Sequence, residues 1–525
     1  MSFEGFTEEE LEKMPDRIAA AFTDKKILIT GGTGFMGKVL VEKILRKCPD
    51  VGEIILLVRT KKGKNPKQRL EEIFSGPLFE QVRNLRGGLD PLLAKVSIVA
   101  GDCMEKKLAM SDEDQQRVID EVHYIIHAAA TIRFDEELKK AVILNVRGVR
   151  EILALAKQCK KLQIFVHIST AYCHLHEKLL EEKAYPPPAD PHQIIEAIEW
   201  MDDETIATLT PRLLHNFPNS YAFTKALGEA LVVETIQDGS VPAAVLRPSI
   251  VIPIWQEPIP GWTDNINGPT GLLIGAGKGV IRTMYCKSNS YADFLPVDVF
   301  INGIMIGIWH YVMIGDKEKN IVNFTSSAEV KVTWNEMIEA GREIITNRVP
   351  LNGVAWYPGG SMKHSRLQHN ICAFFFHWVP AVIVDTLLFC LGYKPVLWRV
   401  HQRISKGFEV FEYYTNNQWD FKSDIAQTER RKLNPRERRD YKVDSVGLDI
   451  TKYFEDCIRA ARIYILKEYD DTLPAARRHM TVMWWVDVIV QFLFWGMILY
   501  WISGWFGFNS QVATSPEELP SVLAA

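Results

Sequence analysis

Tyr221 and Lys225 are the two residues whose types and spacing most directly suggest chemistry. They lie four positions apart, so a helix would place both side chains on one face. An ammonium group near a phenol stabilises the phenolate, and we expect it to lower the tyrosine pKa from about 10. Such a tyrosine can donate a proton near neutral pH. Because Tyr-x-x-x-Lys pairs are also common on helix surfaces, the prediction needs support from other parts of the chain.

A glycine-rich turn near the N-terminus provides that support. It follows the apolar run 27–29 and precedes a helix-like run at 38–45. Its residues are Thr30, Gly31, Gly32, Thr33, Gly34, Phe35, Met36 and Gly37. Glycines let the backbone approach a pyrophosphate, and the helix N-terminus offers N–H groups and a positive dipole end to it. The order strand, glycine turn, helix therefore predicts a dinucleotide site.

Short apolar runs alternate with helical patterns through the first half of the chain. We expect strands at 27–29, 54–58, 96–100, 124–127, 164–168 and 243–247. This alternation predicts an α/β fold with a Rossmann-type doubly wound parallel sheet. Ligands bind at the carboxyl ends of such strands, where Asp102, Ala128 and Ala129 follow the third and fourth strands. The small alanines would leave room for a flat cofactor.

Arg59 ends the second expected strand and bears on which dinucleotide binds. An acidic residue near this point binds a ribose hydroxyl, whereas an arginine accommodates a 2′-phosphate. The acid is absent, and Lys61 and Lys62 follow Arg59. The pattern favours NADP over NAD, and the alternative is a group of basic surface residues at a strand end.

Composition excludes several classes of protein. A chain of 525 residues is long enough for two or three domains. Its net charge of -4 gives no indication of nucleic-acid binding. The eight cysteines include no Cys-x-x-Cys pair, so we expect neither a metal site nor a disulfide framework. The polar N-terminus does not resemble a secretory signal.

The C-terminus contains a segment suited to a bilayer. Residues 488–508 include no Asp, Glu, Lys or Arg, and their length is sufficient to cross a membrane. Arg477 and Arg478 precede the segment, and no Lys or Arg follows it. The positive-inside rule then places the bulk of the protein in the cytosol. Asp487 and Gln491 keep open the alternative of a buried or interfacial helix.

Two further segments have more than one interpretation, and a third looks irregular. The apolar run 371–392 could be a membrane-dipping hairpin, a wall of a substrate channel or a pair of core helices, and the core interpretation is favoured. The basic stretch 430–439 is typical of a solvated face and could also meet anionic headgroups. Residues 255–323 look irregular.

The expected organisation follows from these segments. It comprises a polar N-terminal segment (1–24), an NADP-binding domain with insertions (25–350), a helical C-terminal domain (351–475), a transmembrane segment (481–508) and a short tail (509–525).

Together these motifs resemble the extended short-chain dehydrogenase/reductases, and within them the eukaryotic alcohol-forming fatty acyl-CoA reductases. The generic part of the resemblance rests on segments 30–37, 127–131, 169–172, 221–225, 246–251 and 260–262. The more specific part rests on the proline-rich insert at 185–188, the sequence Glu-Trp-Met-Asp-Asp at 199–203, segments 264–265 and 268–271, and the apolar C-terminal domain.

The resemblance implies roles for several residues. Tyr221 would be the acid and Lys225 its partner, while Asn145 would support the proton path. Thr170 would hydrogen-bond the substrate oxygen, and Ser169 is a near-equal candidate because a one-residue slip in alignment exchanges the two. The cofactor contacts implied beyond the glycine turn include Pro248 and Ser249.

The resemblance also implies the reaction. A long-chain or very-long-chain fatty acyl-CoA would be reduced by NADPH through an aldehyde to a primary alcohol, in wax or ether lipid synthesis. The membrane would be that of the endoplasmic reticulum or the peroxisome, and the oligomeric state stays open.

Two rival functions remain: a hydroxysteroid dehydrogenase-like oxidoreductase and a non-catalytic lipid-binding protein. Three further residues also bear on the chemistry. Cys173 is interpreted as a small buried hydrophobe rather than an acyl carrier, and Lys278 and Arg282 as weak candidates for the CoA phosphates.

Overall fold

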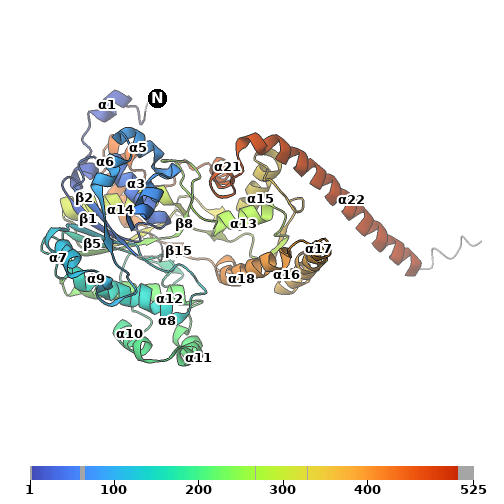
Figure 1. Cartoon of the computed structure of the whole chain (residues 1–525), viewed down its shortest axis with the longest axis horizontal. Helices are drawn as coiled ribbons and strands as arrows, with labels where there is room; N and C mark the ends of the chain where they lie inside the picture. Colours follow the sequence, from blue (N-terminus) through green and yellow to red (C-terminus); the bar gives the residue numbers. More distant parts are fainter. Residues whose placement is uncertain (1–2, 60–65, 267, 328, 506–525) are drawn as a thin grey trace, which may run out of the picture.

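A seven-stranded parallel sheet forms the centre of the molecule (Figure 1). The computed structural model describes residues 3–59, 66–266, 268–327 and 329–505. The strand order is β12-β7-β5-β4-β1-β2-β3, so the direction of winding reverses between β1 and β4. The strands are β1 (Lys26–Thr30), β2 (Glu53–Val58), β3 (Val96–Ala100), β4 (Tyr124–His127), β5 (Ile164–Ile168), β7 (Ala243–Pro248) and β12 (Ile321–Phe324). This topology confirms the predicted Rossmann-type fold.

Helices cover both faces of the sheet. On one face lie α3 (Phe35–Lys47) and α14 (Val297–Trp309), and on the other lie α9 (Gly148–Ala156) and α12 (Ser220–Gln237) (Figure 1). Helix α14 belongs to the segment 255–323 that the sequence describes as irregular, and that description is wrong. Nearly every residue of α14 is buried, so the helix lacks the polar face that reveals a surface helix.

The acidic N-terminal segment packs against the basic stretch near the C-terminus. Arg438 pairs with Glu4 at 2.6 Å and Arg439 with Glu12 at 2.7 Å. The buried carboxylate of Glu437, in α20 (Pro435–Asp440), accepts a hydrogen bond from the backbone N–H of Arg17 at 2.9 Å. The basic stretch is therefore neither a purely solvated face nor free for lipid headgroups, since the chain's own acids occupy it.

The C-terminal part is mainly helical, as predicted. Its principal helices are α15 (Trp334–Glu343), α16 (Arg366–Ala373), α17 (Val379–Cys390), α18 (Leu397–Asn416), α19 (Asp424–Arg431) and α21 (Ile450–Ala460). A π-helical turn, Phe374–Trp378, joins α16 to α17. The favoured core interpretation of 371–392 is wrong, because α17 projects from the body and exposes most of its apolar side chains.

Within the described part of the chain, three helices are long and apolar enough to cross a membrane. The first, Val297–Ile314, is largely buried in the core, whereas Arg366–Cys390 and Asp470–Ser503 are mostly exposed. The last belongs to α22 (Leu473–Trp505), which extends away from the body (Figure 1). The expected transmembrane segment begins inside α22, and its end at 506–508 and the tail 509–525 lie outside the described residues. The exposed apolar helices support membrane association.

Candidate active site

The glycine turn lies where the sheet reverses its winding. Gly31 has a φ of +74°, and a Cβ there would lie 2.8 Å from the backbone carbonyl carbon of Ala128, so only glycine fits between β1 and the end of β4. Thr30 Oγ1 accepts a hydrogen bond from Ala129 N at 3.2 Å. Gly34 caps α3 without a side-chain hydrogen bond to its first turn. A phosphate can therefore reach the N–H groups of this turn, so these residues fit a dinucleotide.

The structure describes only some of the residues expected to bind the ribose end of the dinucleotide. Arg59 is exposed after β2, while Lys61 and Lys62 lie outside the described residues, and the preference for NADP remains a prediction. Asp102 accepts a hydrogen bond from Met104 N at 2.9 Å and so stabilises a local turn.

Arg69 is a basic residue at the glycine turn that sequence reasoning missed. It lies on α4 (Pro66–Phe74) and donates a hydrogen bond to Thr33 Oγ1 at 3.2 Å. Nothing in the local sequence separates Arg69 from other helix arginines, because its partner lies on another element.

The segment around Trp262 joins α3 to the C-terminal half. Phe35 stacks on Trp262 with ring centroids 6.0 Å apart, and Lys38 pairs with Asp264 at 2.5 Å. Gly261 has a φ of +77°, and a Cβ there would lie 2.1 Å from the carbonyl oxygen of Asp456 in α21. The C-terminal part thus packs directly against the segment next to the cofactor turn.

Helix α12 brings the proposed acid to the end of β5. Asn219 caps the helix by accepting a hydrogen bond from Ala222 N at 2.9 Å, which places Tyr221 in its first turn. The buried Lys225 donates from Nζ to the carbonyl oxygen of Ile168 at 2.6 Å. The Thr170 hydroxyl, just beyond β5, lies near enough to the Tyr221 phenol to lower its pKa, and it donates to the carbonyl oxygen of Pro248 at 3.5 Å. Acid, lysine and hydroxyl therefore come together.

The pKa values differ from the expectation. Burial raises the pKa of Tyr221 to about 12, and the neighbouring Thr170 hydroxyl lowers it only in part. The expected lowering by Lys225 is wrong for this structure, because Lys225 points to the Ile168 carbonyl. Burial lowers the pKa of Lys225 to about 8. Removing water from a phenolate or an ammonium penalises the charged form of each.

The structure distinguishes Thr170 from Ser169. Ser169 Oγ donates to Glu229 Oε2 at 2.6 Å, so a carboxylate already holds this hydroxyl. Thr170 donates a long hydrogen bond of 3.5 Å to the Pro248 carbonyl and lies beside the phenol, so it is the better placed of the two to contact a substrate oxygen.

Asn145 does not contact Tyr221 or Lys225 through its side chain. Its Nδ2 donates to Thr224 Oγ1 at 3.0 Å, and its Oδ1 accepts from Thr131 N at 2.9 Å. It lies in a π-helical turn, Ile143–Arg147, that packs against α12. Its side chain therefore holds the segment after β4 against α12, and its role in a proton path remains a prediction.

Glu229 is the buried residue that sequence reasoning overlooked. Besides Ser169 it accepts hydrogen bonds from Arg247, whose Nε lies at 3.1 Å, and from Cys173, whose Sγ lies at 3.5 Å. The contact with Cys173 supports a structural cysteine. A signal was available, because Glu229 stands four residues after Lys225 on the same helix.

Aromatic residues surround the Tyr221 ring. Phe134 lies 5.2 Å from it, and Tyr414 of α18 lies 5.3 Å from Phe134 between ring centroids. The Tyr414 hydroxyl also accepts from Asn219 Nδ2 at 3.0 Å. The end of α18 therefore closes the site with residues more than 190 positions away in sequence from Tyr221 and its cap.

Pro248 and Ser249 lie beside the site at the end of β7. The carbonyl oxygen of Pro248 accepts from Ala171 N at 2.8 Å, next to Thr170. Ser249 Oγ is buried and has no hydrogen-bond partner within the described part of the chain. A buried hydroxyl of this kind is suited to a bound ligand, which agrees with its predicted cofactor contact.

The two weak candidates for CoA phosphates are already bound internally. Lys278 pairs with Glu468 at 2.6 Å, and Arg282 lies 3.8 Å from Asp487 of α22. That expectation is wrong for both residues as they stand in the structure.

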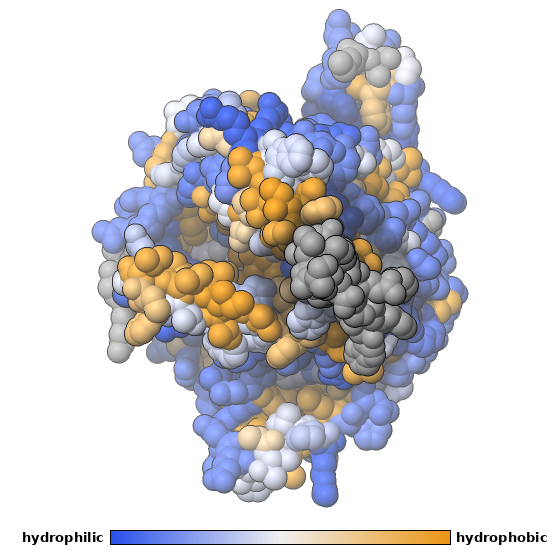
Figure 2. Space-filling model, turned by 90° about the vertical axis from the view of Figure 1, so that its right-hand side faces the viewer, coloured by the Kyte–Doolittle hydropathy of each residue, from blue (hydrophilic) through white to orange (hydrophobic). Residues whose placement is uncertain are grey.

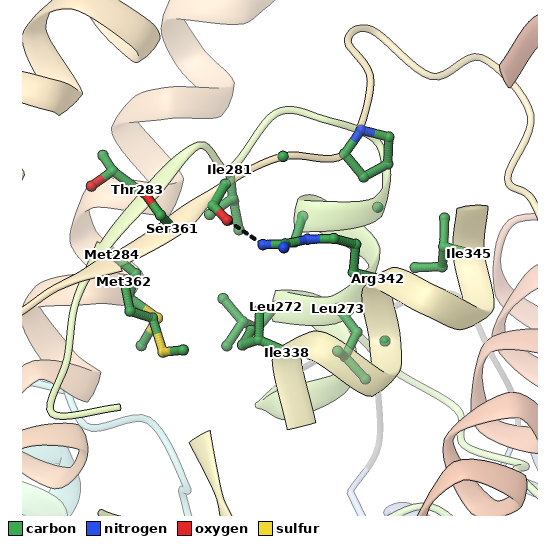
Figure 3. Close-up of a pocket in the computed structure, with 16 residues that line it drawn as sticks. Leu272, Leu273, Ile281, Thr283, Met284, Ile338, Arg342, Ile345, Ser361 and Met362 are labelled. Atoms are coloured by element: carbon green, nitrogen blue, oxygen red, sulfur yellow. Dashed lines mark hydrogen bonds between the residues drawn. The ribbon is translucent and has the colours of Figure 1, made fainter. Parts of the chain in front are cut away.

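An apolar pocket lies between the reductase domain and the C-terminal helices (Figure 3). It is formed by α13 (Pro269–Gly277), α15 and the short pair β9 (Thr283–Tyr285) and β14 (Ser361–Lys363). Leu272, Met284 and Ile338 line it, and Arg342 along one side donates to the carbonyl oxygen of Gly360 at 2.5 Å. Apolar walls of this kind suit an apolar ligand.

This fold and site define a class of protein. A Rossmann sheet with a glycine turn at its switch point, and a Thr, Tyr and Lys set at the ends of β5 and α12, are the parts of a nicotinamide-dependent reductase of the extended short-chain type. An NAD-binding model described as "Male sterility protein" matches residues 29–304, and a second model with that description matches residues 376–468.

Curated relatives define the family. Fatty acyl-CoA reductase 1 of Rattus norvegicus is 37% identical over 483 residues, covering 91% of this chain and 92% of its own. The Homo sapiens protein of that name is 36% identical over 482 residues, with coverage of 91% and 92%. Fatty acyl-CoA reductase wat of Drosophila melanogaster is 34% identical, with 86% of each chain covered. The chain belongs to the fatty acyl-CoA reductase family and is an oxidoreductase.

Solved structures agree on the fold. The terminal R domain from the myxalamid PKS-NRPS biosynthetic pathway has a TM-score of 0.54 at 18% identity, covering 84% of this chain and 91% of its own. The reductase domain of a nonribosomal peptide synthetase from Mycobacterium tuberculosis has a TM-score of 0.53 at 18% identity, covering 87% and 98%.

The Thr170→Val protein tests the assignment of the hydroxyl. We expect its reductase kcat to fall by about 10²–10³, because it loses a donor to the developing oxyanion while keeping its shape. Ser169→Ala is the matched control, and it should lose about 1.5–3 kcal/mol of stability, because its hydroxyl bonds a buried carboxylate, and little turnover. Steady-state kinetics and thermal melts measure both, and a larger loss of kcat in Ser169→Ala would contradict the assignment.

The pH profile tests the state of Lys225. Its pKa is lowered to about 8, so the ammonium is present below that pH and lost above it. Tyr221 keeps its proton to about pH 12, so a decline near pH 8 reports the lysine. We expect kcat/KM for the free enzyme to fall as pH rises through about 8. A profile that stays flat through that range would contradict a catalytic requirement for the Lys225 charge.

Proposed function

We propose that this chain reduces long-chain or very-long-chain fatty acyl-CoA to a primary fatty alcohol, with NADPH as the reductant and release of CoA. One observation carries the proposal: the Thr170, Tyr221 and Lys225 set is assembled beside a dinucleotide turn. It occurs in a chain that aligns over 91% of its length with a fatty acyl-CoA reductase.

The residues of the site suit both reduction steps. The nicotinamide, when bound, supplies the hydride for each step. The hydroxyl of Thr170 and the phenol of Tyr221 would donate hydrogen bonds to the carbonyl oxygen of the thioester and stabilise the oxyanion that forms there. Collapse of that intermediate expels the CoA thiolate and leaves an aldehyde. In the second step Tyr221 would give its proton to the alkoxide, and Lys225 would stabilise the resulting phenolate after its ammonium turns from the Ile168 carbonyl toward it.

Two arginines support NADPH as the particular cofactor. Arg59 is exposed at the end of β2, where a ribose 2′-phosphate would lie, and Arg69 is held beside the glycine turn by Thr33. Guanidinium groups bind phosphate in a bidentate manner. The exposed position of Arg59 leaves its donors accessible to a ligand.

The location proposed is a membrane of the endoplasmic reticulum or the peroxisome, with the reductase domain in the cytosol. Arg477 and Arg478 are exposed at the start of α22, on the side of the reductase domain, which supports this orientation. Acyl chains and fatty alcohols partition into lipid, so a membrane-associated enzyme meets its substrate and product where they accumulate.

A stoichiometric assay tests the reaction. Full-length protein in detergent or vesicles is incubated with NADPH and a series of acyl-CoA chain lengths, and cofactor oxidation, aldehyde and alcohol are measured. We expect two NADPH to be oxidised for each alcohol formed and each CoA released. Tyr221→Phe should lose most of this turnover, since the proton donor is removed.

The same assay separates the rival functions. Aldehyde as the sole product would contradict an alcohol-forming enzyme. Turnover of a hydroxysteroid with no reduction of acyl-CoA would favour the dehydrogenase-like alternative, and binding of acyl-CoA without turnover at any chain length would favour the non-catalytic one.

The two arginines give a prediction about cofactor choice. Removing a hydrogen bond to a charged group costs about 1.5–3 kcal/mol, so Arg59→Ala and Arg69→Ala should each raise KM for NADPH by about 10- to 100-fold and leave KM for NADH little changed. Arg431→Ala, which changes an exposed arginine of α19, is the matched control. Equal changes for both cofactors would contradict a role in binding the 2′-phosphate.

A further inference from the structure

The side chains of α17 are distributed in the opposite way to those of a helix in water. Together with the end of α16 and the π-helical turn between them, α17 directs a narrow stripe toward the body, and the residues of that stripe are small or polar: Ala373, His377, Ala381 and Asp385. The exposed side chains are large and apolar, and they include Phe374, Phe376, Val382, Ile383, Leu387 and Phe389. A helix in water buries its apolar face and exposes its polar one, so the surroundings of α17 are not aqueous.

The polar residues of the stripe are satisfied internally. His377 Nε2 accepts a hydrogen bond from the backbone N–H of Arg282 at 2.9 Å. The carboxylate of Asp385 accepts three hydrogen bonds, each of 2.9 Å, from the backbone N–H groups of Val396, Leu397 and Trp398 at the start of α18. These bonds fix the turn between α17 and α18 and leave the apolar face of α17 as the outer surface of the hairpin.

The topology excludes a simple crossing of the bilayer by this segment. The apolar stretch Arg366–Cys390 is long enough to span, but the chain turns back and α18 packs along α17. The far end of α18 carries Tyr414 into the aromatic cluster around Tyr221. Both ends of the hairpin therefore belong to the body of the protein, on the same side of any membrane.

The charge of the hairpin and its position in the molecule indicate what covers the apolar face of α17. Between residues 366 and 408 the one acidic side chain is the buried Asp385, whereas Lys394, Arg399, Arg403 and Lys406 are exposed, and the acids Glu409 and Glu412 follow on the half of α18 that leads back to Tyr414. Basic residues beside an apolar helix face fit anionic lipid headgroups. Helices α17 and α22 also project from the same side of the molecule, and Figure 2 shows hydrophobic side chains gathered on that face.

Asp487 fixes the direction of α22 relative to this face. It accepts a hydrogen bond from Trp356 Nε1 and lies 3.8 Å from an Arg282 nitrogen. Arg282 is also the residue whose backbone N–H bonds His377 of the hairpin. One residue thus links α22 to the hairpin, and beyond Asp487 the residues 488–505 extend about 27 Å, close to the thickness of a hydrocarbon core.

We propose that the hairpin of α16, α17 and α18 is a second membrane contact, which lies in the interface of one leaflet with the apolar face of α17 in the acyl chains and the basic residues of α18 among the headgroups. A lipid leaflet is the partner, and the contact is separate from α22. Because α16 packs on β9 and β14, two walls of the apolar pocket, the contact places that pocket next to the lipid surface. The inference does not depend on the reaction proposed above.

The exposed native cysteine Cys390, at the end of α17, allows a direct test. Full-length protein with Cys159→Ser and Cys372→Ser is labelled at Cys390 with an environment-sensitive fluorophore and reconstituted into vesicles of phosphatidylcholine and phosphatidylserine. We expect its emission to shift to shorter wavelength, and most of it to be quenched by lipids that carry a nitroxide near the top of the acyl chain. The matched control carries Cys390→Ser and Glu113→Cys, a labelled site exposed on α7 (Asp112–Glu121), and should show neither effect.

Two outcomes would overturn the proposed lipid contact, and a set of charge variants tests the contribution of the basic residues. Emission at Cys390 that matches the control and resists quenching would overturn the proposal. A shift that is not quenched by nitroxide lipid, and that disappears when protein is diluted into excess lipid, would assign the face to a second copy of the chain and would also overturn it. Replacing Lys394, Arg399 and Arg403 by Gln should reduce quenching more in anionic than in neutral vesicles. All these readouts are independent of activity, so failure of the proposed reaction would not affect them.

Discussion

The carboxylate of Glu229 lies buried where three elements meet, and the arrangement of the active site depends on it. It accepts hydrogen bonds from Ser169 beyond β5 and from Arg247 of β7, while it stands on α12 itself. Burying two charges is costly, and the cost is offset only when partners and geometry are good. Because the same three elements carry Thr170, Tyr221 and Ser249, the ion pair fixes their relative positions as well as its own.

The distance in sequence between contacting residues explains which parts of the fold and of the site could be predicted. The glycine turn and the Tyr221, Lys225 pair are signalled within a few consecutive residues, and the strands of the sheet by continuous apolar runs. The contacts that complete the site are long-range: Ser169 and Glu229 are 60 positions apart, and Asn219 and Tyr414 are 195 apart. No periodicity in the sequence reports such a contact before the fold is known.

Two predictions are wrong for a different physical reason: the core position of residues 371–392 and the lowered pKa of Tyr221. The run 371–392 is equally apolar whether it faces a core or a lipid leaflet, so composition could not decide, and the small and polar stripe at four-residue spacing was the informative signal. The charge of Lys225, taken alone, predicts a lowered pKa for Tyr221. Burial acts in the opposite direction, and it dominates where the ammonium is directed to a backbone carbonyl.

The C-terminal half is part of the active site as well as a means of membrane attachment. Tyr414 and Phe134 help to enclose Tyr221, and an enclosed site strengthens each hydrogen bond to a developing oxyanion because little water competes. Helix α18 connects this aromatic cluster to the hairpin: Trp398 and Tyr414 are separated by about 24 Å along its axis. A rigid helix that contacts the lipid surface at one end and closes the active site at the other couples enclosure of the site to attachment at the membrane, so an acyl chain would enter the enzyme on the side from which the substrate arrives.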